Sequence, residues 1–168
     1  GFYVPSLYRV RSEHGRIVEH TPRTLAPSRI RPATAALDGP YPHRYTTVVT
    51  PNTEFGDRML VEVSNGCRWG CRFCWIGYNQ LPPRNAPPAE LLDIIQARAG
   101  DTKKVGLVSA SVCDYPGLYD VLDGLRGTHE TSLSALRIDA VDERFAVAMA
   151  ETGQKTPTMA PEAGSDRL

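Results

Sequence analysis

The sequence predicts an α/β fold in which short strands and longer helices alternate along the second part of the chain. Two observations predict it: apolar, β-branched runs recur along this part, and segments with the helical spacing of apolar residues separate them. With 168 residues, the chain has about the length of one ordinary domain. Three such alternations predict parallel strands joined by right-handed crossovers, with functional groups at the carboxyl ends of the strands.

Residues 1–56 are expected to form an irregular linker or wrapping segment without a core of its own. Prolines interrupt this stretch too often for long helices. They are Pro5, Pro22, Pro27, Pro32, Pro40, Pro42 and Pro51. Short extended pieces are expected at 2–10 and 46–50.

The first elements of the α/β region follow residue 57. Residues 59–64 form a short apolar, β-branched run that is typical of a buried strand. Residues 89–99 follow two prolines, carry apolar side chains on one face and end before Gly100, which predicts a helix. The apolar run 105–109 predicts a second strand.

The second half of this region repeats the pattern. The next helix ends at Gly127 and carries apolar residues at i, i+3, i+4 and i+7. These residues are Leu118, Val121, Leu122 and Leu125. Residues 133–138 predict a third strand, and Asp142 is expected to cap the following helix. The inward-facing residues of that helix are expected to be Phe145, Ala148 and Met149. Residues 156–160 predict a fourth strand, although Pro157 cannot donate a hydrogen bond within a sheet.

The composition excludes several classes of protein. Nineteen Lys and Arg balance nineteen Asp and Glu, so the chain offers no net field to attract a nucleic-acid backbone or an anionic membrane. Apolar residues make up 41% and charged residues 23%, as in a globular protein. No apolar run is long enough for a membrane helix, no signal peptide is recognised, and four cysteines are too few for a disulfide scaffold. We therefore expect a cytoplasmic protein.

Three cysteines are the strongest chemical signal. Cys67, Cys71 and Cys74 follow the first predicted strand at C-x3-C-x2-C spacing, and Gly66 and Gly70 permit a tight loop. Soft thiolates select zinc or iron–sulfur clusters. A structural zinc ion takes four protein ligands, whereas three ligands suit a four-iron cluster with one open iron. The alternatives are a zinc site, three unrelated buried thiols, or a redox pair plus one thiol.

With Phe73 as the aromatic residue before its last cysteine, this motif resembles that of the radical S-adenosylmethionine (radical SAM) superfamily. Other segments are similar to the cobalamin-binding-type members of that superfamily, namely 4–8, 60–67, 106–109, 134–139 and 160–168. The resemblance implies a partial (β/α)6 barrel, of which 57–168 would hold about the first four βα units. We accordingly expect the chain to be a fragment that ends after the fourth strand.

The same resemblance implies the chemistry. Cys67, Cys71 and Cys74 would hold a [4Fe-4S] cluster, and S-adenosylmethionine would bind the open iron. Reductive cleavage would yield a 5′-deoxyadenosyl radical that abstracts hydrogen from a substrate, while the protein positions the reactants and excludes water. An electron donor of the flavodoxin or ferredoxin type is implied as a partner. In the narrower group cobalamin is held by an upstream domain, and none of that domain is present here.

The resemblance also assigns cofactor contacts at the strand ends. Ser109 and Ser111 follow the second strand, where hydroxyls and carbonyls can accept from the amino group of S-adenosylmethionine. Glu162, with Ser165 nearby, would contact the ribose hydroxyls, and the backbone of Phe73 would approach the adenine. An ordinary polar loop at the serines, and a helix start at Glu162 capped by Ser165, are the alternatives.

Two residues have competing interpretations. Arg137, within the third predicted strand, is expected to face the cofactor carboxylate, with a buried ion pair to Asp139 or Glu62 as the alternative. Cys113, after the second strand, is interpreted as a small buried hydrophobe in preference to a substrate-side thiol.

The leading functional hypothesis is a radical SAM enzyme of unknown substrate. A methylthiotransferase acting on tRNA or a ribosomal protein is the second hypothesis, and it requires a further set of three cysteines. A non-enzymatic iron–sulfur carrier or a zinc-stabilised binding module is the third. Trp69 and Trp75 are expected to shield the cluster. Tyr3, Tyr8 and 23–31 are interpreted as solvated surface rather than an RNA-binding arm.

Overall fold

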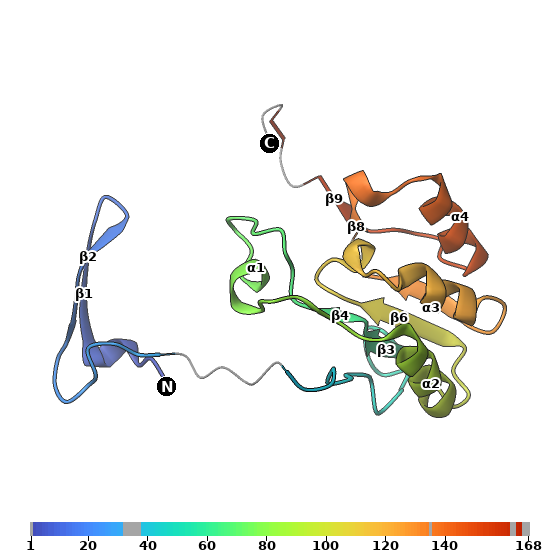
Figure 1. Cartoon of the computed structure of the whole chain (residues 1–168), viewed down its shortest axis with the longest axis horizontal. Coiled ribbons are helices and arrows are strands. Elements are labelled where there is room, and N and C mark those ends of the chain that lie inside the picture. Colours follow the sequence, from blue (N-terminus) through green and yellow to red (C-terminus); the bar gives the residue numbers. More distant parts are fainter. Residues whose placement is uncertain (1, 32–37, 135, 162–163, 166–168) are drawn as a thin grey trace. The chain divides into compact units, whose positions relative to one another are not determined.

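The structure is a computed structural model that describes residues 2–31, 38–134, 136–161 and 164–165. It divides the chain into two compact units, Gly1–Pro40 and Tyr41–Leu168 (Figure 1). Among the described residues, no helix has the length and apolar character needed to cross a membrane.

The first unit is built around an antiparallel β-hairpin. A short 3-10 helix, Pro5–Leu7, leads into β1 (Tyr8–Glu13), which pairs with β2 (Arg16–Pro22). The turn between the strands has positive φ at both His14 and Gly15, as a tight hairpin turn requires. The Tyr8 and His20 rings stack with centroids 4.7 Å apart.

The hairpin corrects the expectation that this proline-rich stretch is irregular. Of the extended piece expected at 2–10, only the end from Tyr8 is a strand, which continues to Glu13, whereas Pro5–Leu7 form the 3-10 helix. The partner strand β2 was not predicted. The physical reason is the position of the prolines, since Pro5 precedes the hairpin and Pro22 is its last strand residue. The interior of the hairpin is therefore free to form hydrogen bonds.

The second unit contains the predicted α/β alternation. Strands β3 (Arg58–Glu62), β6 (Lys104–Val108) and β7 (Glu130–Leu133) form a parallel sheet in the order β3-β6-β7. Strands β8 (Leu136–Arg137) and β9 (Met159–Ala160) form a separate parallel pair. The described strands are consistent with part of a barrel, and they do not close into one.

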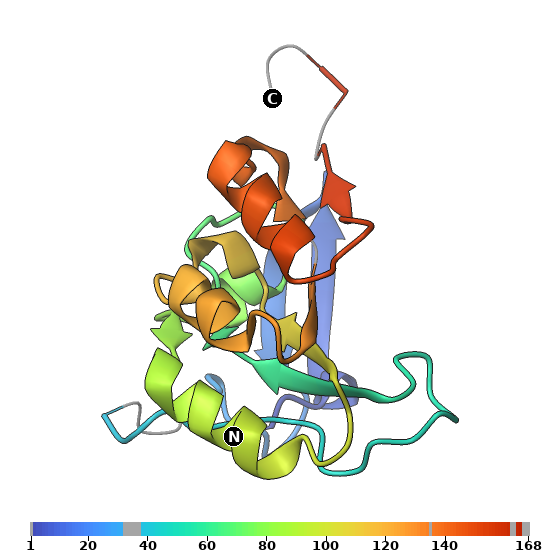
Figure 2. The same ribbon diagram turned by 90° about the vertical axis from the view of Figure 1, so that its right-hand side faces the viewer.

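Three helices cover one face of these strands. They are α2 (Pro88–Arg98), α3 (Leu118–Leu125) and α4 (Glu143–Glu151). Figures 1 and 2 both show them in a row along the same side of the strands. The predicted stripe of α3 is confirmed, because all four of its apolar residues are buried. The Asp142 cap is confirmed too, as its carboxylate accepts a hydrogen bond of 2.8 Å from the backbone N–H of Phe145.

The core lies between the sheet and these helices. Side chains of β3, β6 and the helices form most of it, and the majority of the core side chains are fully buried. The largest of these fully buried side chains are Phe145, Met59, Leu91, Ile95, Leu107, Leu122 and Leu125. Burial alternates along β3, where Met59 and Val61 face the helices. Apolar burial of this extent is the main stabilising term for the unit.

Two predicted strands differ from the observed ones. The third begins at Glu130 rather than residue 133 and is divided into β7 and β8, because the paired register with β6 starts at Glu130 and ends at Leu133. The fourth consists only of Met159–Ala160, after Pro157, which lacks the N–H that a longer pairing would use.

The segment before β3 pairs with the edge of β3 that does not face β6. Tyr45 forms an antiparallel bridge with Val61, and the backbone N–H of Thr46 donates to Leu60. This pairing lies at 44–46, slightly ahead of the extended piece expected at 46–50. The Tyr41 hydroxyl donates to Glu62 over 2.7 Å, and burial together with this carboxylate raises the pKa of Tyr41 far above its usual value.

Candidate functional site

The cysteine motif lies on a loop whose base is closed by two short strands. The first predicted strand changes partner at Val63 and continues as β4 (Ser64–Asn65), which pairs with β5 (Arg84–Asn85). Residues 66–83 therefore leave the carboxyl end of β3 and return to the same place. Helix α1 (Ile76–Asn79) lies on this loop, well separated from the sheet in Figure 1.

Gly66 is required where the loop leaves the sheet. Its φ is +88°, and a Cβ built there would lie 2.1 Å from the Gln80 carbonyl oxygen. No side chain can be accommodated at that distance, and the positive φ itself favours glycine. The sequence-based role of Gly66 in closing the loop is thus supported by a close backbone approach.

The interior of the loop is organised by backbone contacts. The N–H of Cys74 donates to the carbonyl of Cys71 over 2.9 Å, so these two cysteines occupy one turn. The Tyr78 hydroxyl donates to the Gly70 carbonyl over 2.8 Å, and Gly70 has φ of +57°. Cys67, Cys71 and Cys74 are free thiols of intermediate burial, as thiolates accessible to a metal centre should be.

The donor set favours a cluster over a single ion. Among the described residues, no group of three His, Cys, Asp or Glu side chains is placed to hold one metal ion. A structural zinc ion takes four protein ligands, whereas a four-iron cluster with one open iron takes three thiolates, each on a different iron. The donor set of three thiols on one loop fits that cluster.

A row of serines joins the carboxyl ends of the three parallel strands. The hydroxyls of Ser64 and Ser109 lie 2.5 Å apart. The Ser134 hydroxyl donates to the Ser109 carbonyl over 3.0 Å, and the N–H of Ser111 donates to the Ser109 hydroxyl over 3.1 Å. The predicted pair Ser109 and Ser111 therefore lies beside the base of the cysteine loop, at the edge where the fold class predicts chemistry.

Asp114 is the centre of the polar contacts at this edge. It belongs to a 3-10 turn, Val112–Asp114, after β6. Its carboxylate accepts hydrogen bonds from the Ser111 hydroxyl, the Trp69 indole N–H and the Arg137 guanidinium. Burial raises the pKa of Asp114, but these three donors outweigh burial and hold the pKa below its usual value.

A small cavity connects the loop to the strand ends. Its volume is about 160 Å³. Its walls come from the loop and from the end of β6: Ser64, Gly66, Cys67, Arg68, Pro83, Asn85, Ser111, Asp114 and Pro116. It therefore holds a cysteine, serine hydroxyls and a carboxylate within one concave site, the arrangement expected of a binding site. Asp114 was not predicted as a site residue from the sequence. Its position three residues after Ser111, on the turn that follows β6, could have indicated it.

Arg137 forms ion pairs with two carboxylates, Asp114 and Asp139. Its guanidinium donates to Asp114 over 2.6 Å and forms two hydrogen bonds to Asp139. The expected alternative was a buried ion pair with Asp139 or Glu62. Arg137 does pair with Asp139, but that carboxylate is exposed rather than buried, and Glu62 binds Tyr41 and Arg44 instead. The Arg137 contacts raise its own pKa, with Asp139 as the largest cause.

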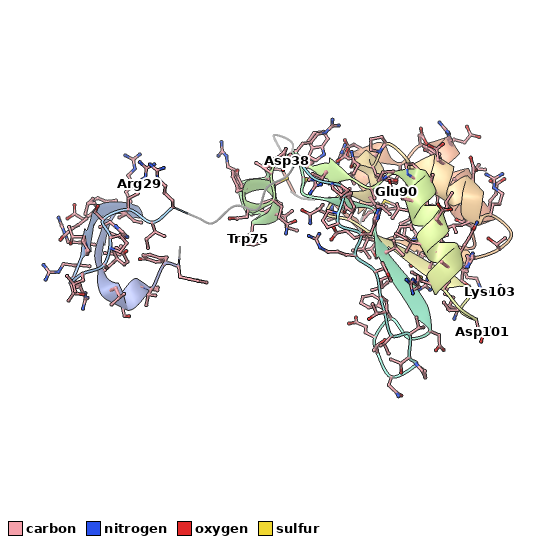
Figure 3. All side chains as sticks on the ribbon, turned by 60° about the horizontal axis from the view of Figure 1, so that its bottom comes forward. Arg29, Asp38, Trp75, Glu90, Asp101 and Lys103 are labelled. Carbon is pink, nitrogen blue, oxygen red and sulfur yellow. The ribbon has the colours of Figure 1, made fainter. Side chains whose placement is uncertain are left out.

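The remaining candidates lie apart from these contacts. Phe73 is 75% exposed on the loop, Ser165 is exposed, and Glu162 lies outside the described residues. Cys113 is half-buried against the core, and burial raises the pKa of its thiol, in keeping with a small hydrophobe. Trp75, labelled beside α1 in Figure 3, lies at the opposite end of the unit from Asp101 and Lys103, which precede β6.

The family follows from a sequence comparison that covers most of this unit. The chain belongs to the radical SAM superfamily, whose family profile matches residues 61–168. It is also 33% identical over 147 residues to an uncharacterized protein of Methanocaldococcus jannaschii. That alignment covers 83% of this chain and 31% of the archaeal protein, so the chain spans about a third of the length of that relative. No solved structure matches the chain.

Proposed function

We propose that this chain carries the cluster-binding and cofactor-binding part of an enzyme that cleaves S-adenosylmethionine reductively. The observation that supports it is the juxtaposition of three free thiols, on one closed loop, with the serine row and Asp114 at the ends of parallel strands. Membership of the radical SAM superfamily implies the same [4Fe-4S] cluster and the same cofactor.

Each side chain has a role in this proposal. Cys67, Cys71 and Cys74 would hold the cluster, which when bound and reduced would supply the one electron that reductive cleavage of S-adenosylmethionine requires. Ser109 and Ser111 offer hydroxyl and carbonyl acceptors to the ammonium of the cofactor. Asp114 lines the same cavity and accepts hydrogen bonds from the Ser111 hydroxyl and from Arg137.

Arg137 binds the cofactor carboxylate in this proposal, and Asp139 competes with it. The Asp139 side chain is 65% exposed and occupies two donors of the guanidinium. Displacing an exposed carboxylate from an arginine costs little. The cofactor carboxylate can therefore replace Asp139 while Asp114 keeps its contact with Arg137.

The proposal extends to the rest of the cofactor site and to the partners of the reaction. The ribose contact of Glu162, the backbone contact of Phe73 with adenine and the nearby Ser165 rest on resemblance. The same holds for a flavodoxin- or ferredoxin-type electron donor and for cobalamin in an upstream domain. Substrate-facing loops in such folds come from several strand ends.

The test is anaerobic reconstitution of the full-length protein with iron and sulfide, followed by dithionite and S-adenosylmethionine. We expect 5′-deoxyadenosine, and we expect Cys67→Ala, Cys71→Ala and Cys74→Ala each to abolish it. Cys113→Ala is the matched control, because it removes a thiol outside the loop and should keep the product. A cluster-loaded, folded protein that forms no 5′-deoxyadenosine, or a protein with one zinc and no iron, would overturn the proposal.

A further inference from the structure

Trp69 lies between two of the three cysteines and is held from outside the loop. Its indole N–H donates to one oxygen of Asp114, 45 residues along the chain. The other oxygen of Asp114 accepts from Arg137 over 2.6 Å. The guanidinium carbon of Arg137 lies 3.9 Å from the centroid of the Trp69 ring, so the three side chains contact one another pairwise.

The three contacts are of the stronger kinds. Both hydrogen bonds to Asp114 involve an ionised acceptor, and such bonds are roughly twice as strong as neutral ones. A guanidinium within about 6 Å of an indole face makes a cation–π contact, and tryptophan is the best partner for it. Arg68 adds a longer ion pair to Asp114 and also lies over the Trp69 ring.

The second tryptophan of the loop provides an internal contrast. Trp75 directly follows Cys74 but is 68% exposed, against 45% for Trp69. Within the described part of the chain no hydrogen bond or cation–π contact to the Trp75 ring is found. Two tryptophans within two residues of a cysteine thus differ in whether side chains from outside the loop contact their rings.

We propose that Trp69 is a positioning residue that fastens the cysteine loop to the carboxyl ends of β6 and β8 through Asp114 and Arg137. Trp69 is two residues from both Cys67 and Cys71, so its position sets where these two thiols lie relative to the strand ends. The effect of this fastening on the cluster rests on the proposed function, because it assumes that the loop binds a cluster. The fastening itself is a property of the metal-free chain.

The fastening is tested in the metal-free protein by tryptophan fluorescence. These 168 residues contain two tryptophans, so Trp75→Phe leaves Trp69 as their one tryptophan emitter and Trp69→Phe leaves Trp75. We expect Trp69 to be quenched by acrylamide less than Trp75, and Asp114→Asn to increase quenching of Trp69 but not of Trp75. Equal quenching of the two, or no response of Trp69 to Asp114→Asn, would overturn the proposal without bearing on the cluster.

The consequence for the cluster is tested by iron retention under a chelator. Loss of a residue that orients metal ligands typically weakens metal binding about tenfold or more, so we expect iron loss from Trp69→Ala to be about tenfold faster than from Trp75→Ala. Trp69→Phe keeps the ring over Arg137 and should be intermediate. Equal iron loss from the two alanine variants would contradict the proposal. A wild-type protein that binds no iron would contradict the proposed function instead, and the fluorescence test would still stand.

Discussion

The helix-covered face of the sheet and its carboxyl edge are stabilised in different ways. On the covered face, Met59, Val61 and Phe145 are removed from water and make non-directional contacts. At the edge, Asp114 and Arg137 are held by short, directional hydrogen bonds and stay partly accessible. We infer that the helix-covered face supplies most of the stability of the unit. The carboxyl edge positions chemical groups and adds little to stability.

The largest effect is expected from Phe145→Ala in the covered face. The side chain is 1% exposed, and removing a buried phenyl ring leaves a cavity that costs about 3–5 kcal/mol. Urea unfolding monitored by circular dichroism measures the change. If the free energy of unfolding fell by less than about 1 kcal/mol, the core would have collapsed around the site. The covered face would then not be the main source of stability.

The next effect is expected from Gly66→Ala at the edge. The added Cβ would overlap the Gln80 carbonyl oxygen, so the loop base must open, and we expect iron incorporation to be lost while the sheet stays folded. Gly100→Ala is the matched control, because Gly100 also has positive φ but nothing within 4 Å of the added Cβ. Normal iron content in Gly66→Ala would contradict the role assigned to this close approach.

A smaller effect is expected in the acid range from Asp114. Its pKa is depressed in the folded protein, so its ionised form contributes stability above the unfolded pKa, near 3.8, and that contribution is lost as the pH falls through the lower folded value. Urea midpoints of the wild type and Asp114→Asn should therefore differ at about pH 6 and approach each other at about pH 2.5. A difference that does not change with pH would argue against an ionised Asp114.

The smallest effect is expected from Asp139→Asn. The Arg137 guanidinium lowers the pKa of this exposed carboxyl, so Asp139 is ionised at neutral pH and competes for Arg137. If Arg137 binds the cofactor carboxylate, the variant should bind S-adenosylmethionine up to about fivefold more tightly, the scale of an exposed ion pair. Equilibrium dialysis measures this, and weaker binding by the variant would contradict the role of Arg137.

The covered face was predictable because its signal is local. The spacing of apolar residues in α3 and the Asp142 cap of α4 each lie within a few residues of one another, and both were recognised correctly. The cysteine loop was predictable for the same reason, since its three thiols span eight residues, with Gly66 before them and Gly70 between two of them. The boundary of β7 and the hairpin β1–β2 were not, because both depend on pairing with another strand.

The sequence by itself thus determined the alternating class of the fold, the buried faces of its helices and the placement of three thiols on one loop. Tertiary structure alone decided that Trp69, Asp114 and Arg137 meet, and that Glu62 binds Tyr41 and Arg44 rather than Arg137. The physical reason is that periodicity encodes which face of an element is buried. It does not encode which strand ends become neighbours, and the partners at the edge of the sheet depend on that neighbourhood.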